Sequence, residues 1–365
     1  MFAERMNRAR AEMVAQGVDA LLLSVGADLP YMTGYEAMPL ERLTMLVLPA
    51  VGDAQLVVPE LEAPRVVVRD EFTLAPWSEL EDPIALVNRL LGGATNVAIG
   101  ETTWARFVVD LINTNSKLSF RHATSVMKPL RAVKTADEIE RRRAASHAVD
   151  RIAARLQAGE IPLVGQTEEH VSAELGRQII EEGHGKVNFA IVAAGENAAS
   201  PHHHPGDRVI KEGEVVLCDF GGTMYGDDGI GYCSDITRCV FTGTPPAEFV
   251  ELYDVLHQAQ VAGVQAATVG TPAEDVDRVG RAIITDAGFG KYFFHRTGHG
   301  IGVEAHEEPY IVEGNADPLV AGNAFSIEPG IYVASKWGAR LEDIVVAADS
   351  GPDSLNLVDH HLALV

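Results

Sequence analysis

The chain has 365 residues, which is enough for one large domain or two domains of ordinary size. Hydrophobic residues make up 47% of it and charged residues 22%, the balance of an ordinary globular protein. The 52 acidic and 29 basic residues leave a net charge of -23, and a field of that sign repels phosphate groups, so the composition argues against a nucleic-acid partner.

The first residues, MFAERMNRARAEM, carry charges throughout and lack the apolar stretch of a secretory signal. The longest apolar stretches, at 20–25 and 43–51, are far too short to span a bilayer. The small, odd number of cysteines favours a reducing compartment over a disulfide framework. We therefore expect a cytoplasmic protein that does not bind membranes.

The first third of the chain alternates between helical and strand patterns. An amphipathic helix is predicted over 2–16, ended by Gly17, and an apolar strand over 20–25. The other predicted elements are strands at 43–48, 56–59 and 97–99, and helices at 84–91 and 103–112. This order predicts an α/β domain.

A second domain is expected to begin near residue 130. Thr135 and Glu138 form a capping box, in which the threonine hydroxyl accepts from the amide of Glu138 and the glutamate carboxylate reaches back. The helix that starts there is predicted to run to Gly159. We therefore expect an N-terminal domain over 1–130 and a catalytic domain over 131–365.

The second domain repeats one pattern twice at low resolution. The first half is predicted to contain helices at 136–158 and 167–182 and strands at 187–193, 215–222 and 232–241. The second half is predicted to contain helices at 247–268 and 272–287 and strands at 303–306, 324–332 and 341–347. Such a repeat would place the last hairpins of the two halves face to face about a pseudo-twofold axis in an α+β domain.

Each of these two hairpins carries a pair of carboxylates in a strand context. The first pair is Asp219 in VVLCDFGG and Asp235 in GYCSDITRCV. The second pair is Glu328 in AFSIEPGIY and Glu342 in GARLEDIVV, and His299 in HRTGHGIG stands between the pairs. Opposed Cβ atoms on antiparallel strands lie about 4.5–5.5 Å apart, which suits the ions about 3.5–4 Å apart of two-metal hydrolases. The five residues are therefore a candidate ligand set for two divalent metal ions.

An alternative for each acid taken alone is a salt bridge in the core, for which Arg238 and Arg340 are available. Burying four such acids beside a glycine-flanked histidine is costly without compensation, which favours metal for the whole set. Oxygen-rich ligation with one imidazole suits Mn²⁺ best, with Co²⁺ and Zn²⁺ also feasible. Cys218 precedes Asp219 and so faces the opposite side of its strand, where we expect it to pack in the core.

Several segments resemble the pita-bread metallopeptidase family, which contains Xaa-Pro dipeptidase (prolidase), aminopeptidase P and methionine aminopeptidase. They follow the family's order: SPHHHPGD, VVLCDFGG, YCSDITR, HRTGHGIGVEAHEEP, FSIEPGIY and GARLEDIVV. The resemblance covers essentially the whole chain and is closest to the bacterial proline-peptidase branch. It implies a creatinase-like α/β domain before a pita-bread catalytic domain. Members are often homodimers, so the resemblance also implies a homodimer here.

The resemblance also implies roles for individual residues. The metal ligands would be Asp219, Asp235, His299, Glu328 and Glu342, with Asp235 and Glu342 bridging the ions. The catalytic residues would be His202, His306 and Glu328, and the residues on the substrate side His295, Tyr310 and Arg340. His203 and His204 are expected to be inert surface histidines. Several prolidases have an arginine where this chain has Tyr310, and it helps to hold the carboxylate of a C-terminal proline, so its absence leaves room for longer substrates.

The activity implied by the resemblance is hydrolysis of Xaa-Pro bonds at the N-terminus of dipeptides or short peptides. A hydroxide bridging two metal ions would attack the peptide carbonyl, and Glu328 would pass the proton to the leaving nitrogen. Two alternatives share the two-domain plan: a metal-free creatinase-like C–N hydrolase and a non-catalytic binding protein. Both typically lack the metal ligands that this chain retains.

Overall fold

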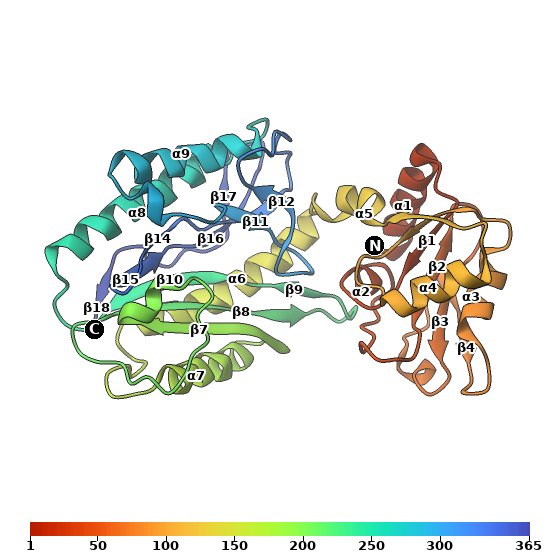
Figure 1. The fold of residues 1–365 in the computed structure, drawn as a ribbon, viewed down its shortest axis with the longest axis horizontal. Coiled ribbons are helices and arrows are strands. Elements are labelled where there is room, and N and C mark those ends of the chain that lie inside the picture. The colour runs from red at the N-terminus through yellow and green to blue at the C-terminus, as the bar shows by residue number, and fades with distance from the viewer. The chain divides into compact units, whose positions relative to one another are not determined.

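The computed structural model describes residues Met1–Val365, which form two compact units. The first unit contains Met1–Arg131 and the short turn Gly226–Ile230, and the second contains Ala132–Tyr225 and Gly231–Val365 (Figure 1). No helix has both the length and the apolar character needed to cross a membrane.

The first unit is built on one six-stranded sheet with the order β4-β3-β2-β1-β5-β6. Its strands are β1 (Ala20–Leu23), β2 (Met45–Pro49), β3 (Ala54–Pro59), β4 (Phe72–Trp77), β5 (Asn96–Ile99) and β6 (Ser119–His122). Its helices are α1 (Phe2–Gln16), α2 (Asp28–Thr33), the 3₁₀ turn η1 (Ala63–Arg65), α3 (Pro83–Leu91), α4 (Ala105–Thr114) and α5 (Thr124–Arg131). The pairs β1–β2 and β2–β3 are antiparallel, and the other three pairs are parallel.

The structure confirms each predicted element of this unit and adds five that were missed. Leu22, Val47 and Val97, from three of the predicted strands, lie together in the sheet's core. The missed elements are α2, η1, β4, β6 and α5. All of them are short, and all except β6 contain a proline, so neither periodicity nor propensity marks them clearly.

The first half of the second unit packs two helices on one face of an antiparallel sheet. It contains α6 (Ala136–Gln157), α7 (Glu168–Glu181), β7 (Lys186–Ala194), η2 (Gly195–Ala199), β8 (Val215–Tyr225), β9 (Gly231–Cys233) and β10 (Ile236–Phe241). The predicted capping box of α6 is present in both directions. Cys218 packs with α6 and α7, as expected, whereas Leu217 on the other face packs with the second half of the unit. Asp219 shares that second face, so it is directed toward the second half.

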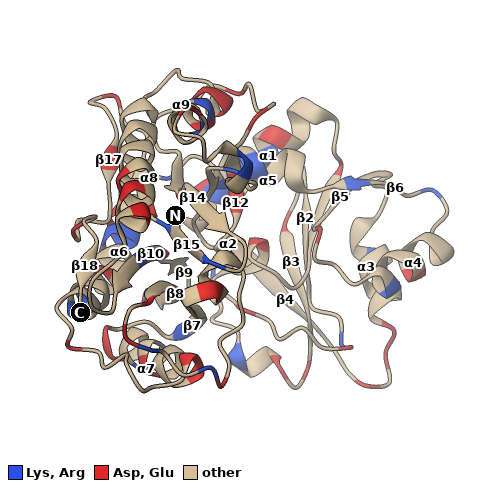
Figure 2. Ribbon diagram, turned by 60° about the vertical axis from the view of Figure 1, so that its left-hand side comes forward, with Lys and Arg blue, Asp and Glu red and all other residues tan.

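The second half contains another helix pair and a second set of strands. They are α8 (Ala247–Ala266), α9 (Ala273–Asp286), η3 (Gly290–Tyr292), β11 (Gly298–Gly300), β12 (Glu307–Ile311), β13 (Ala324–Ile327), β14 (Gly330–Val333), β15 (Trp337–Arg340), β16 (Asp343–Val346), β17 (Asp353–Ser354) and β18 (Ala363–Leu364). Figure 2 shows acidic residues and no basic ones on α8, which carries Glu248, Glu251 and Asp254.

Two predictions for this half are corrected by the structure. The strand predicted at 303–306 is wrong, because the amide of Gly302 donates to the carbonyl of Glu304 and closes a turn there. The strand predicted at 324–332 is two strands, β13 and β14. Glu328 and Pro329 lie between them, and proline has no amide to continue a ladder.

The C-terminal segment is fastened to the second unit by Arg238 on β10, which is fully buried. Its guanidinium donates to the carbonyls of Val358 at 3.0 Å and Asp359 at 2.9 Å. It also donates to the carbonyl of Glu342 at 2.8 Å and pairs with the Asp343 carboxylate at 2.7 Å. One side chain therefore joins β10, β16 and the segment before β18.

Replacing Arg238 by methionine is expected to lower the free energy of unfolding by about 3–5 kcal/mol, because a buried carboxylate and several carbonyls lose their donor. Urea denaturation measures this change. The matched control is Arg143→Met, because Arg143 pairs with Asp353 at the surface and its loss should cost at most about 1 kcal/mol. An equal loss of unfolding free energy in the two variants would contradict the role of Arg238 in fastening the C-terminal segment.

Candidate functional site

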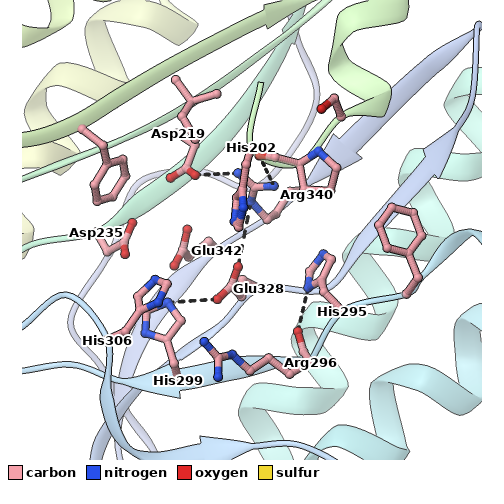
Figure 3. Close-up of a pocket in the computed structure, with 15 residues that line it drawn as sticks. His202, Asp219, Asp235, His295, Arg296, His299, His306, Glu328, Arg340 and Glu342 are labelled. Atoms are coloured by element: carbon pink, nitrogen blue, oxygen red, sulfur yellow. Dashed lines mark hydrogen bonds and ion pairs between the residues drawn. The ribbon is translucent and has the colours of Figure 1, made fainter. Parts of the chain in front are cut away.

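A cavity of about 680 Å³ opens between the two halves of the second unit (Figure 3). It is lined by every site residue predicted from the sequence except Tyr310: His202, Asp219, Asp235, His295, His299, His306, Glu328, Arg340 and Glu342. The structure thus brings the predicted set together from six separate segments.

Three of the four carboxylates lie where a strand is interrupted. Asp235 lies between β9 and β10, Glu328 between β13 and β14, and Glu342 between β15 and β16. Asp219 lies within β8, opposite Thr237 of β10. Thr237 also forms a β-bridge to Glu342, and its hydroxyl donates to the Glu342 carboxylate at 2.7 Å. Thr237, which the sequence analysis did not single out, therefore links the two halves.

His299 is held rigidly by its neighbours on β11. A Cβ atom at Gly298 would lie 1.8 Å from the carbonyl oxygen of Ser326, and one at Gly300 would lie 2.2 Å from that of Glu308, so neither position admits a side chain. The Nδ1 atom of His299 lies 3.1 Å from the carbonyl of Gly300, which accepts its proton and leaves Nε2 free to bind a metal. Nε2 faces Glu328, with 3.1 Å to Oε1.

The carboxylates are buried without enough donors to satisfy them. Asp219, Asp235 and Glu342 each have one buried oxygen with no hydrogen-bond partner. Burial, followed by the charges of neighbouring carboxylates, raises the pKa of both Asp235 and Glu342 well above its usual range. Burial also raises the pKa of Glu328, but the hydrogen bond and charge of His299 outweigh it and lower that pKa to about 2.

These residues fit a divalent metal centre. Donor atoms of Asp235, His299 and Glu342 all lie within 4.8 Å of one another, and all three residues are buried. Oxygen atoms that lack a hydrogen-bond donor are available to a cation, and a cation would also offset the repulsion between the carboxylates. The donor set of oxygens and one imidazole suits Mn²⁺ and its neighbours in the transition series.

Arg340 and His295 form one side wall and are fully engaged with the protein. Arg340 pairs with Asp219 at 2.5 Å, so the salt-bridge alternative holds for one oxygen of that acid. It also donates to the Tyr332 hydroxyl at 2.8 Å. Burial lowers the pKa of His295, whose ring nitrogens lie 2.7 Å from the carbonyl of Arg296 and 3.0 Å from the Tyr332 hydroxyl. Both residues line the cavity, but their donors are already occupied.

His306 and His203 have different surroundings and different roles. Loss of solvation, together with the charge of His299, lowers the pKa of His306 to about 4, so its ring is neutral near pH 7. The expectation that His203 is an inert surface residue is wrong, because its Nε2 lies 2.7 Å from the fully buried Glu168 carboxylate. That carboxylate also accepts from the amide of Ala194, so His203 anchors the loop that carries His202.

The sequence analysis missed six lining residues, two of which, Ser200 and Pro201, directly precede His202. Phe189 and Ile191 alternate on β7 and face the cavity, and Phe294 precedes His295. An alternating apolar pair is equally typical of a core face, so only the fold assigns it to the cavity. Arg296, in HRTGHG, also lines the cavity, and its guanidinium stacks on the ring of Tyr310 at 4.3 Å from the ring centre.

Comparisons with known proteins give family matches over both parts of the chain. Residues 140–349 match the model of metallopeptidase family M24, and residues 5–133 match the creatinase/prolidase N-terminal domain. The Probable dipeptidase PepE of Mycobacterium tuberculosis is 42% identical over 370 residues, covering 100% of this chain and 97% of the relative.

Two solved structures are similar to this chain over its whole length. The crystal structure of dipeptidase PepE from Mycobacterium ulcerans has a TM-score of 0.93 at 41% identity and covers 100% of this chain and 98% of its own. The crystal structure of recombinant prolidase from Thermococcus sibiricus has a TM-score of 0.93 at 34% identity, with coverage of 100% and 99%.

Removing metal with a chelator is expected to make stability fall as pH rises. The folded protein keeps protons on Asp235 and Glu342 that the unfolded chain releases above a pH of about 4, so stability is highest below that value and is lost at higher pH. Bound metal replaces those protons and should flatten the dependence between about pH 5 and 8. Thermal melts with and without chelator measure it. Parallel curves would contradict the metal assignment.

Proposed function

The chain belongs to metallopeptidase family M24, and we propose that it hydrolyses Xaa-Pro bonds of dipeptides or short peptides with two divalent metal ions. The family and the fold class expected from the motifs are confirmed, as is the prediction of a metallopeptidase. The creatinase-like hydrolase and the non-catalytic binding protein have no support from these relatives.

The observation that carries this proposal is the group of unsatisfied carboxylate oxygens in one cavity. We assign the ions to Asp219, Asp235, His299, Glu328 and Glu342, with Mn²⁺ the preferred metal. When bound, the ions lower the pKa of water, so that hydroxide is available near neutral pH. The relatives named as a dipeptidase and a prolidase support a small peptide as the substrate.

The protein's own groups move the protons and hold the substrate. Glu328 is ionised near pH 7, so its carboxylate can accept a proton from the attacking water and pass it to the leaving nitrogen. Neutral His306 can donate a hydrogen bond to the carbonyl oxygen as negative charge develops there, and His202 on the opposite wall can hold the peptide. Ser326 donates to Glu328 at 3.0 Å and keeps its carboxylate in place.

The apolar side chains that line the cavity suit the proline side of the substrate. Phe189, Ile191 and Phe294 line the cavity beside the acids, and a proline ring is apolar and rigid. The leaving nitrogen of an Xaa-Pro bond has no N–H, so the site needs no acceptor for it in the ground state. The domain limits at residue 130, a homodimer and a cytoplasmic location stay predictions.

The protein loaded with Mn²⁺ is expected to cleave Xaa-Pro dipeptides, because the cavity offers both metal ligands and apolar side chains. Release of free proline measures the activity, and Xaa-Ala dipeptides with the same first residue are the control. The same assay on Xaa-Pro-Yaa tripeptides measures the preferred length. No cleavage of any Xaa-Pro peptide with Mn²⁺, Co²⁺ or Zn²⁺ would refute the proposal.

Replacing Asp235 by asparagine is expected to abolish metal binding and activity together, because the amide keeps the shape but loses the charge of a ligand. Elemental analysis and the proline-release assay measure the two effects. Asp227→Asn, in the exposed turn after β8, removes the same charge and should keep both. Full activity in Asp235→Asn would show that the ligand assignment is wrong.

A further inference from the structure

The cavity contains two arginines, and only one of them is free to bind a substrate. Arg340 is buried and gives its donors to Asp219, Tyr332 and other protein groups. The guanidinium of Arg296 forms no ion pair and no hydrogen bond within the chain. A half-buried arginine without an acidic partner, beside a cavity rich in acids, needs an explanation.

Arg296 is held in place by packing. Its guanidinium lies over the ring of Tyr310 on β12, 4.3 Å from the ring centre, in a cation–π contact. Arg296 lines the same cavity as His306. Figure 3 shows its side chain below Glu328, with the guanidinium directed toward His299. A stacked guanidinium keeps its edge free to donate hydrogen bonds.

The charges of a dipeptide match this arrangement. Its amino group is positive and suits the acidic part of the cavity, whereas its carboxylate lies one residue beyond the bond that breaks. The acidic residues of the cavity would repel the substrate's C-terminal carboxylate, so a cation must hold that carboxylate. Arg296 is the lining residue with a full, unengaged positive charge, and a guanidinium can bind a carboxylate with two hydrogen bonds.

We propose that Arg296 binds the C-terminal carboxylate of a dipeptide substrate and that Tyr310 is the positioning residue that orients it. This inference rests on the proposed peptidase function and specifies the substrate length. The inference also explains the residue at position 310. The chain has a tyrosine there in place of an arginine, and the tyrosine ring supports the guanidinium of Arg296. Dipeptides are then favoured over longer peptides.

A second role for Arg296 would be to recognise an acidic side chain in the first residue of the substrate. That role makes a different prediction, because it depends on the side chain and not on the terminal carboxylate. Comparing Leu-Pro with Asp-Pro, and each with its C-terminal amide, separates the two roles. If replacing Arg296 lowered activity on Asp-Pro alone and left Leu-Pro unaffected, the proposal would be overturned.

The test measures kcat/KM of the Mn²⁺-loaded enzyme on Leu-Pro and Leu-Pro amide. We expect Arg296→Gln to lower kcat/KM on Leu-Pro by about 10- to 100-fold, the scale of a hydrogen bond to a charged group, chiefly through KM. On the amide, which has no carboxylate, the change should be less than about threefold by the same reasoning. Arg296→Lys keeps the charge and should recover part of the loss.

Two controls make the outcomes decisive. Arg278→Gln removes the same charge from the exposed face of α9 and should leave both rates unchanged. The wild-type protein itself should prefer the acid to the amide, so the proposal remains testable even where a variant folds poorly. Equal loss on acid and amide, or no loss on either, would overturn the role of Arg296 while the peptidase function stood. Failure of the wild type on every peptide would instead refute the proposed function.

Discussion

The mutual repulsion of buried carboxylates is the constraint on which the rest of the catalytic unit depends. Asp219, Asp235, Glu328 and Glu342 share one cavity, and three of them keep an oxygen that no protein donor reaches. Burying such groups costs several kcal/mol unless a cation compensates for it. The surrounding fold must therefore hold the acids against their repulsion and leave room for positive charge.

The fold meets this constraint by distributing the acids over interrupted strands and joining the interruptions. Strand ladders hold the backbone on both sides of Asp235, Glu328 and Glu342, while the residues themselves are released from regular pairing. Thr237 bonds to Glu342 across the two halves, and Arg340 supplies a fixed positive charge to Asp219. The positions of Asp219 and Glu342 thus depend on both halves of the unit.

Much of this could be predicted from the sequence, because the informative signals were local. Periodicity and the Thr135 capping box predicted the long helices, and motif order predicted which residues would share a cavity. The strand predictions were wrong at 303–306 and 328–329. A turn hydrogen bond at the first segment and a proline at the second prevent a strand, although the residue pattern is typical of one. Arg296 and His203 were missed since their partners, Tyr310 and Glu168, are distant in sequence and only tertiary packing brings them together.

The tether formed by Arg238 has a consequence for how the protein matures during synthesis. The same guanidinium holds the carbonyl of Glu342 and the carbonyls of Val358 and Asp359, and β18 then pairs with β10. A chain still emerging from the ribosome lacks that segment, so Glu342 is without its final support until translation has passed residue 359. Glu342 therefore has its full set of backbone contacts only once the last residues of the chain have folded onto β10.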